Sequence, residues 1–403
     1  MTEPSSSSPA HVVIAGGGVA ALEALIALHE LAGDQVRVTL LAPGPDFVYR
    51  PLSVAEPFCL GHATHHPLAD VARDFGAELV RGALAEVDPG RRTVTTSDGA
   101  TLSYDSLLVA VGAFSQQVSE HAITFGAEGA PEALSGLIAD LEEGYARRVA
   151  FVVPSSATWS LPLYELAIMT ARHVSGAGVD DVHLTFVTPE EAPLELFGSE
   201  GSRVAAELLA DAGIEFVGSA AAEFAHNGVN AGGRRIDVER ILTLPVPVGP
   251  SIPGLPDTPD GFVPVDEHGA VPGVDGVYAA GDMTASPIKQ GGLAAQQAVA
   301  AAEAIAARHG ADIDPQPYRP VLRGMLLTSG RSRWLRAPAG DTPSDSQTSL
   351  HALWWPPTKI ATRYLAPYLM GRDDAAYLNS SAPEAHHAVE RDLELLGPQI
   401  RRR

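Results

Sequence analysis

A glycine-rich turn near the amino terminus has the spacing of a phosphate-binding site. The pattern Gly16-x-Gly18-x-x-Ala21 lies between an apolar run, residues 11–15, and an Ala- and Leu-rich stretch, residues 20–31. The first glycine permits a tight turn, the second lets a pyrophosphate approach the backbone, and the small third residue allows close helix packing. The amino terminus of the following helix carries partial positive charge and would face the phosphates. We therefore expect a dinucleotide to contact Gly16, Gly18, Ala20 and Ala21.

The elements around this turn form one βαβ unit. Residues 11–15 are typical of a buried strand, residues 20–31 of a helix that ends at Gly33, and residues 36–41 of a second strand. In many such units an acidic residue at the end of the second strand binds a ribose. Here Ala42 and Pro43 stand at that position. Adenosine must therefore be held by another group, by backbone or by water.

The α/β pattern continues along the chain. A hairpin is expected around Asp98-Gly99 and a buried strand at 106–111. A second α/β unit follows, with a strand at 149–153, a helix at 161–173 and a strand at 182–187. The fold class predicted is α/β, with two Rossmann-like (FAD/NAD(P)-binding) domains, one inserted in the other, plus a small C-terminal domain.

The boundaries of these domains follow from amino-acid composition and from the positions of Pro-rich segments. The first ten residues are rich in Ser and Pro, and a Pro-rich linker spans residues 245–259. We expect a disordered lead at 1–10, a flavin domain in two parts at 11–113 and 246–310, a degenerate nucleotide-binding domain at 114–245, and a C-terminal domain at 311–403.

Two further motifs carry a resemblance to a known family. Tyr104 to Gly112 and Val277 to Asp282 resemble the second and third flavin-binding signatures of the FAD-dependent pyridine nucleotide-disulfide oxidoreductase superfamily. The resemblance spans residues 11 to about 308 and implies that the cofactor is FAD. It also implies that Asp282 contacts the ribityl chain. The helix beginning near Lys289 and Gln290 would direct its amino end at the isoalloxazine, favouring negative charge on a reduced flavin. Further cofactor contacts implied are Leu84, Ala110, Gly112 and Gln290.

Arg50 is a further cofactor candidate. Tyr49 to Ser53 resembles the segment after the second strand in flavin reductases of this superfamily. A guanidinium can bond two phosphate oxygens at once, so we expect a phosphate contact from Arg50; the alternative is a surface salt bridge. Some relatives have a Lys just after this segment, but here the residue is Val54.

The second α/β unit departs from a nicotinamide-binding domain. Its first strand is followed by Pro154 to Pro162, which contains no glycine and includes the bulky Trp159. Free backbone amides for a second pyrophosphate are therefore not expected. Residues 162–167 resemble the branch of sulfide:quinone reductase, flavocytochrome c sulfide dehydrogenase and type II NADH dehydrogenase. The resemblance places Trp159 where the sulfide-oxidising members have a cysteine.

Candidates for catalytic groups are few. The chain has one cysteine, Cys59, so paired-cysteine persulfide chemistry cannot be assembled. Its apolar neighbourhood, residues 57–60, favours a small buried side chain over a reactive one. His62, His65 and His66 lack accompanying ligands at metal-site spacing, so no metal is expected. The catalytic candidates are Lys289, Cys59 and Trp355.

The tail combines aromatic and amphipathic character. Trp354 and Trp355 precede an expected helix that presents Ile360, Tyr364, Leu365, Tyr368 and Leu369 on one side. Three interpretations stay open: packing on the flavin domain, a homodimer face, or contact with a quinone or a membrane surface. Tandem Trp beside a flavin could stack a flat substrate.

Charge and composition narrow the function. The formal net charge of −22 disfavours nucleic acid and anionic membrane faces, no window is long and apolar enough to span a membrane, and the first residues favour a cytoplasmic protein. Our hypothesis is an oxidoreductase that passes electrons from a small donor through FAD to a quinone-like or other acceptor. One alternative is an NAD(P)H:acceptor reductase, for quinone or ferredoxin, with an atypical nicotinamide site. Another is a non-catalytic flavin-binding protein.

Overall fold

A computed structural model describes residues 8–155, 158–338 and 345–372. Most of the expected lead, residues 1–7, lies outside this part, and the first strand already begins at Ala10. In the described part, no helix combines the length and apolar character needed to cross a membrane.

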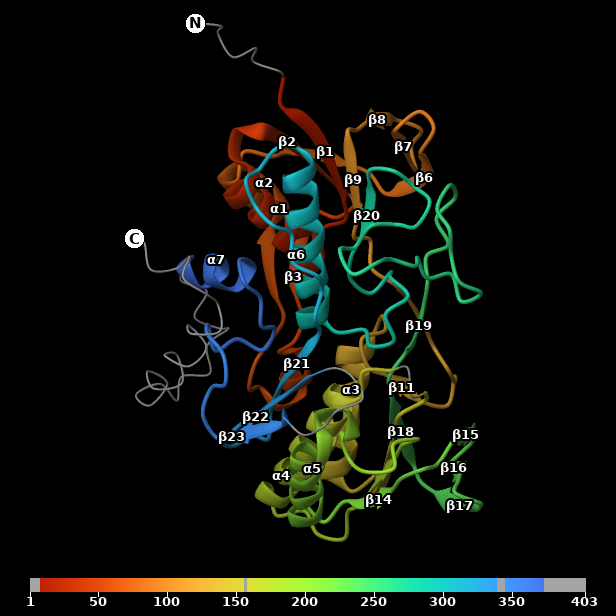
Figure 1. Ribbon diagram of the computed structural model, residues 1–403. Helices are drawn as coiled ribbons and strands as arrows, with labels where there is room; N and C mark the ends of the chain where they lie inside the picture. The colour runs from red at the N-terminus through yellow and green to blue at the C-terminus, as the bar shows by residue number, and fades with distance from the viewer. Residues whose placement is uncertain (1–7, 156–157, 339–344, 373–403) are drawn as a thin grey trace, which may run out of the picture.

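The first sheet is parallel and contains strands from both ends of the first 280 residues. Its order is β20-β9-β1-β2-β5. The bounds are β1 Ala10–Ala15, β2 Val36–Ala42, β5 Glu78–Arg81, β9 Ser106–Val109 and β20 Val277–Ala279. Helices α1 (Val19–Ala32) and α6 (Gly291–Arg308) pack against each other, and Figure 1 shows them side by side next to this sheet. Their alanines permit this close approach.

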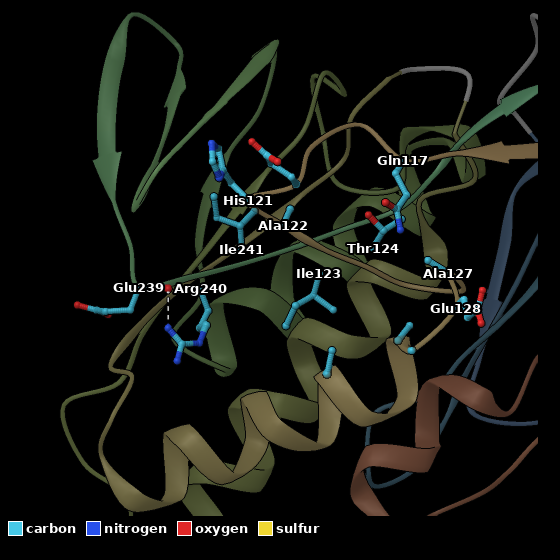
Figure 2. Close-up of a pocket in the computed structure, with 14 residues that line it drawn as sticks. Gln117, His121, Ala122, Ile123, Thr124, Ala127, Glu128, Glu239, Arg240 and Ile241 are labelled. Carbon is cyan, nitrogen blue, oxygen red and sulfur yellow. Dashed lines mark hydrogen bonds between the residues drawn. The ribbon is translucent and has the colours of Figure 1, made fainter.

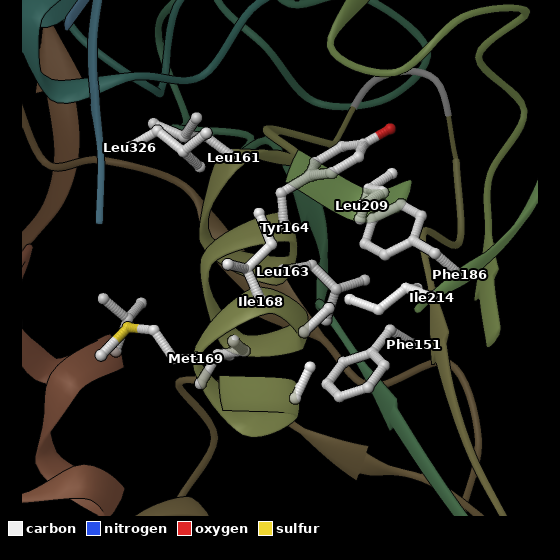
Figure 3. Packing of buried hydrophobic residues seen from close by; sticks show 14 of the residues in the cluster. Phe151, Leu161, Leu163, Tyr164, Ile168, Met169, Phe186, Leu209, Ile214 and Leu326 are labelled. Atoms are coloured by element: carbon white, nitrogen blue, oxygen red, sulfur yellow. The ribbon is translucent and has the colours of Figure 1, made fainter. Parts of the chain in front are cut away.

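The second sheet belongs to the segment between β9 and β20. It is also parallel, in the order β11-β18-β12-β13-β14. The bounds are β11 Ile123–Thr124, β12 Arg148–Val152, β13 His183–Val187, β14 Glu215–Val217 and β18 Arg240–Thr243, with helices α3 Ala130–Glu143, α4 Leu161–Gly176 and α5 Gly198–Asp211. Tyr164 of α4 stacks on Phe186 of β13 with ring centroids 4.0 Å apart, in the core shown in Figure 3. Two parallel sheets make the fold the predicted α/β, Rossmann-like type.

The chain crosses between the two sheets twice, and the crossings pair with each other. β10 (Phe114–Gln116) leaves the first sheet, β19 (Val246–Val248) returns to it, and the two strands are antiparallel partners. Each unit also contains small antiparallel sheets. In the first unit these are β3 (Asp46–Tyr49) with β4 (Thr64–Pro67), followed by α2 (Leu68–Asp74), and a sheet of β6 (Leu84–Asp88), β7 (Thr93–Thr96) and β8 (Thr101–Ser103). In the second unit the sheet consists of β15 (Ala222–Ala225), β16 (Gly228–Ala231) and β17 (Arg234–Asp237). The expected hairpin lies at Asp98-Gly99, where Gly99 has φ +88°.

The last part contains a sheet that the sequence did not suggest. β21 (Val321–Leu326), β22 (Arg333–Pro338) and β23 (Gln347–Ser349) form an antiparallel sheet, and α7 covers only Leu365–Gly371. The expectation of a helix already running through Ile360 was wrong. Prolines follow Trp355 directly, and the indole Nε1 of Trp354 donates to the Thr358 carbonyl at 2.9 Å, which folds this segment as a compact turn.

Candidate functional site

Two of the three glycines in the turn after β1, Gly16 and Gly18, have different surroundings. Gly16 has φ +139°, and a Cβ there would lie 2.2 Å from the Ala110 carbonyl oxygen, so only glycine fits between β1 and β9. Its N–H donates to the Leu41 carbonyl at 2.8 Å. A Cβ on Gly18 would meet nothing within 4 Å. The bare Cα of Gly18, at the amino terminus of α1, therefore faces open space, as an approaching pyrophosphate would require.

The three motifs meet at one edge of the first sheet. The Ala110 N–H donates to Ala15 at 2.7 Å, and the Ala280 N–H donates to Val109 at 3.0 Å. A Cβ on Gly281, whose φ is +85°, would lie 3.2 Å from the Cβ of Ala20. Because the strands are parallel, their carboxyl ends gather where open α/β sheets bind ligands.

A cavity of about 420 Å³ opens at this edge. Three of the expected cofactor contacts line it, Gly16, Leu84 and Gly112, together with Ala42 at the end of β2. Ala110 does not line the cavity but directly precedes Val111, which does. Ala20 and Ala21 are buried in the first turn of α1. The cavity runs from the glycine turn past the ends of β2 and β5, which is the position of the adenosine half of a dinucleotide on such a sheet.

Asp282 and Lys289 lie farther along the same edge. Burial raises the pKa of Asp282, and the charge of Lys289 opposes that rise. Burial lowers the pKa of Lys289 to about 8, against the attraction of Asp282. The ammonium of Lys289 lies 3.7 Å from the ring centroid of Phe262 and donates to the Thr284 carbonyl. In the described part the Asp282 carboxylate has no hydrogen-bond partner, so it is available to accept from ribityl hydroxyls.

Gln290 has a structural task at the start of α6. Its Oε1 accepts from the Leu293 N–H at 2.8 Å, and its Nε2 donates to the Arg323 carbonyl at 3.0 Å. The side chain therefore caps α6 and ties it to β21. This fixes the direction of the helix amino terminus, the group expected from the sequence to face the isoalloxazine.

Arg50 and Cys59 are both at the surface. Arg50 is exposed just after β3, with no ion pair to another described residue, so its guanidinium is open to a ligand. Cys59 is exposed as well, with φ +56° at the end of a 3₁₀ helix, Ser53–Phe58. The expectation of a buried thiol was wrong, because this left-handed residue ends the helix and points outward from the apolar segment.

Two of the three candidate histidines, His65 and His66, have different surroundings. His66 is buried and stacks on Phe47 with ring centroids 6.0 Å apart, whereas His65 is largely exposed. Across the described ranges, no cluster of three or more His, Cys, Asp or Glu side chains could hold a metal ion. These histidines instead belong to the β3-β4 hairpin.

The second sheet contains an acidic residue at the place where a ribose would be bound. Glu190 follows β13, but it is buried and turned inward. It accepts hydrogen bonds from Tyr164 Oη at 2.7 Å, Thr188 Oγ1 at 3.0 Å and Ser160 Oγ at 3.2 Å. Trp159 packs edge-on against Phe197, filling the start of α4. Glu190 was not among the predicted site residues: its spacing after the strand is visible in the sequence, but the inward direction of its side chain is not.

A larger cavity, of about 710 Å³, lies beside α6. Its lining includes Ala295, Gln296 and Arg363, and Trp355 with half of its surface exposed. Trp354 is buried and packs edge-on against Trp334 at 4.5 Å. The two neighbouring tryptophans therefore have opposite surroundings, and only Trp355 is open to a ligand.

A shallower hollow lies on the second sheet, away from these sites. It has a volume of about 320 Å³ and lies between α3, β11 and the start of β18, with Gln117, His121 and Thr124 in its wall (Figure 2). Arg240 at its rim is paired with Asp140. This hollow is at the opposite unit from the glycine turn and has no part in that site.

Comparison with known proteins agrees with this arrangement. A family model described as pyridine nucleotide-disulphide oxidoreductase matches residues 10–148 and 164–303. The sulfide-quinone reductase of Aquifex aeolicus (strain VF5) is 28% identical over 230 residues, which are 52% of this chain and 51% of that protein. The peroxisomal monodehydroascorbate reductase 4 of Arabidopsis thaliana is 26% identical over 193 residues, or 44% of this chain and 38% of that protein. The matched region thus spans about half or less of each relative.

Solved structures are similar over a larger share. The X-ray structure of the sulfide:quinone oxidoreductase from Aquifex aeolicus superposes with a TM-score of 0.74 at 21% identity, covering 84% of this chain and 86% of that chain. A ferredoxin reductase from Rhodopseudomonas palustris gives a TM-score of 0.59 at 17% identity, with 81% of each chain covered. At these identities the similarity is one of fold.

Proposed function

The chain belongs to the pyridine nucleotide-disulphide oxidoreductase family of FAD-dependent oxidoreductases, and we propose that it passes electrons from a small non-nicotinamide donor through FAD to a quinone-like acceptor. The donor half of this proposal rests mainly on Glu190 and the acceptor half on the cavity at Trp355.

The residues at the edge of the first sheet fit FAD. Gly16 and Gly18 leave the backbone open to a pyrophosphate, and Asp282 is available to the ribityl chain. Bound flavin supplies electron transfer between a two-electron donor and its acceptor. The amino terminus of α6, fixed by Gln290, and the ammonium of Lys289 both favour negative charge at the ring end of the cofactor.

The observation that carries the donor half is the internal use of Glu190. A nicotinamide cofactor needs an acceptor for its ribose and a glycine turn for its pyrophosphate. The carboxylate of Glu190 already accepts hydrogen bonds from the hydroxyl groups of Tyr164, Thr188 and Ser160. The turn after β12 contains no glycine. These features support a second unit that stabilises the flavin domain without binding NADH or NADPH.

The acceptor half is supported by the cavity beside α6. The segment that carries Trp355 continues to Ile360, whose N–H donates to Tyr49 Oη at 3.0 Å. Ile360 also packs on Gly291, where a Cβ would lie 3.0 Å from Ile360 Cδ1. The segment that carries Trp355 thereby also contacts the amino terminus of α6, while the cavity itself lies along α6 from Ala295 to Glu303. A half-exposed indole in a mostly apolar cavity suits a flat, weakly polar ring such as a quinone.

Sulfide is a disfavoured donor. The relatives named as sulfide:quinone reductases share the fold, but a persulfide held between two cysteines cannot form in a chain whose only cysteine is the exposed Cys59. Sulfide-driven quinone reduction that survives Cys59→Ala would contradict this reasoning.

The acceptor half can be tested without knowing the donor. Purified protein should be yellow and release FAD on denaturation. After anaerobic photoreduction, stopped-flow mixing with a water-soluble benzoquinone should reoxidise the flavin with a rate that saturates with quinone concentration. Reoxidation that stays linear in quinone, as for free reduced FAD, would contradict a binding site.

The donor half has its own test. After anaerobic mixing with NADH or NADPH, the flavin should stay oxidised for many times the half-life of its reoxidation by benzoquinone. Rapid bleaching by either would overturn the proposal and favour an NAD(P)H:acceptor reductase. A flavin that no donor and no acceptor can change would favour a non-catalytic flavin-binding protein.

A further inference from the structure

The cavity at the glycine turn is almost without polar side chains. It is lined by backbone and by glycine, proline, alanine and larger apolar residues from both parts of the first unit. Asp46 is the single lining residue that carries a polar side chain. A ribose entering this cavity would bring two hydroxyl groups that need acceptors, since a buried polar group without a partner is costly.

The usual position for that acceptor is closed here. Ala42, at the end of β2, is fully buried. A Cβ on Gly17 would lie 3.2 Å from the Cβ of Ala42 and 2.9 Å from a methyl group of Leu68. Residue 42 therefore faces the glycine turn under cover of Leu68, and it offers no acceptor to a ribose.

Asp46 is held near the end of β2 by the turn that follows the strand. The Leu68 N–H donates to the Pro45 carbonyl at 2.9 Å, and the Arg81 guanidinium donates to the Gly44 carbonyl. Asp46 then opens β3, opposite Pro67 of β4. These bonds hold the carbonyls of Gly44 and Pro45, the two residues that precede Asp46, and so restrict the position of the Asp46 backbone.

The Asp46 carboxylate is also available. The one basic side chain within 4 Å of it in the described part is His65, whose Nδ1 lies 3.7 Å from Oδ2, beyond hydrogen-bond distance. The side chain of His65 is 61% exposed and that of Asp46 is 33% exposed, so this contact is weak. Both carboxylate oxygens can therefore accept from a ligand.

We propose that Asp46 replaces the missing strand-end acid and accepts hydrogen bonds from the ribose hydroxyls of the adenosine half of FAD. This inference rests on the proposed function only in taking FAD as the ligand. A carboxylate four residues later in the chain, brought back by a braced turn, then serves a cavity in which every other contact is made by backbone or apolar surface.

The test is flavin affinity. Apo-protein would be titrated with FAD, followed by flavin fluorescence, for the wild type, Asp46→Asn, His65→Ala and Asp34→Asn. Asp34 is an exposed control at the other end of β2. We expect Asp46→Asn to weaken FAD binding by about 10- to 100-fold, the usual effect of a hydrogen bond to a charged group, and both controls to bind as the wild type does. If His65→Ala weakens binding as much as Asp46→Asn, the ion pair matters and the inference is wrong.

A second ligand separates direct contact from a change in fold. An FAD analogue without the adenosine 2′-hydroxyl should bind the wild type less tightly than FAD, while Asp46→Ala, which leaves no side-chain acceptor at this position, should no longer distinguish the two. If Asp46→Ala distinguishes them as the wild type does, another group holds the ribose and the inference fails although FAD binding stands. If the wild type binds no FAD at all, the proposed function itself fails. Asp46→Val repeats the comparison if the Ala variant is poorly folded.

Discussion

The ammonium of Lys359 lies 2.6 Å from Oε2 of Glu165, and the two side chains are 7% and 0% exposed. The other oxygen of Glu165 accepts from the Leu327 N–H at 2.8 Å. Glu165 lies on α4 of the second unit and Lys359 on the segment that leads from Trp355 to α7. This pair therefore joins the second unit to the part of the chain that walls the larger cavity.

Breaking this pair should be costly. Lys359→Met leaves a buried carboxylate without its counter-charge, and we expect the free energy of unfolding to fall by about 3–5 kcal/mol in urea denaturation. The double variant Glu165→Gln/Lys359→Met keeps an acceptor for the Leu327 N–H and buries no charge, so it should be more stable than Lys359→Met alone. As a matched control, Arg203→Ala removes exposed ion pairs with Glu200 and Glu207 and should have a much smaller effect. A single variant as stable as this control would show that the pair does not hold the two parts together.

Glu23 should make stability depend on pH. It is buried on α1 and accepts from the N–H groups of Arg363 and Tyr364 at 2.7 and 3.0 Å and of Leu365 at 2.7 Å. Burial raises its pKa from 4.5 to about 7, with the three N–H donors opposing the rise. Because the folded state binds the proton more tightly than the unfolded state, the contribution of Glu23 is greatest below pH 4.5 and is lost as pH rises to about 7.

The expected change is about 3 kcal/mol, from a shift of roughly 2.5 pH units at 1.36 kcal/mol each. It is measured as the unfolding free energy of the wild type minus that of Glu23→Gln. This difference should decrease as the pH rises from 4.5 to 7, because only the wild type loses a proton at this position. Glu30→Gln, on the exposed side of the same helix, serves as the control. A difference that stays constant with pH would contradict the prediction.

The sequence predicts the parts of this molecule that depend on local chemistry. The turn at Gly16 to Gly18, the hairpin at Asp98-Gly99 and the start of α6 at Gly291 are all where periodicity and glycine placement indicate. Each is determined by a backbone need that one residue type meets, so the type reveals the structure.

Features that depend on distant partners were not predictable in this way. The start of α7 is set by Glu23, more than 300 residues earlier, rather than by the apolar spacing of Ile360 and Tyr364. Glu190 has the right distance from its strand to bind a ribose, yet the hydroxyl groups around it turn it inward. In both cases the outcome depends on which polar groups are buried together, and a single sequence does not show that.

Gly18 offers a clean test of the pyrophosphate site. Because a Cβ there meets nothing within 4 Å, Gly18→Ala should cost the apo-protein less than about 1 kcal/mol, mostly from the poorer helix cap. The same methyl group would stand where the phosphate approaches, so FAD affinity should fall about tenfold or more, equivalent to about 1.4 kcal/mol. Gly136→Ala, in the middle of α3 with equally open space, is the control and should leave FAD binding unchanged. Equal FAD affinity in the Gly18 and Gly136 variants would show that the pyrophosphate does not bind at this turn.

The adjacent tryptophans should separate stability from acceptor binding. Trp354 is 4% exposed and its indole N–H is bonded to Thr358, so Trp354→Ala should lower the unfolding free energy by about 3–5 kcal/mol. Trp355 is 50% exposed and lines the larger cavity, so Trp355→Ala should change stability by no more than about 1 kcal/mol.

The effect of Trp355→Ala should instead appear in the reoxidation of photoreduced flavin by benzoquinone. Half-saturation should move to a higher quinone concentration while the limiting rate changes less, because the indole binds the acceptor and takes no part in the electron transfer itself. Trp355→Phe, which keeps an aromatic face, should recover most of the affinity. If both variants saturate at the wild-type quinone concentration, the acceptor binds elsewhere, and the exposed indole beside α6 needs a different explanation.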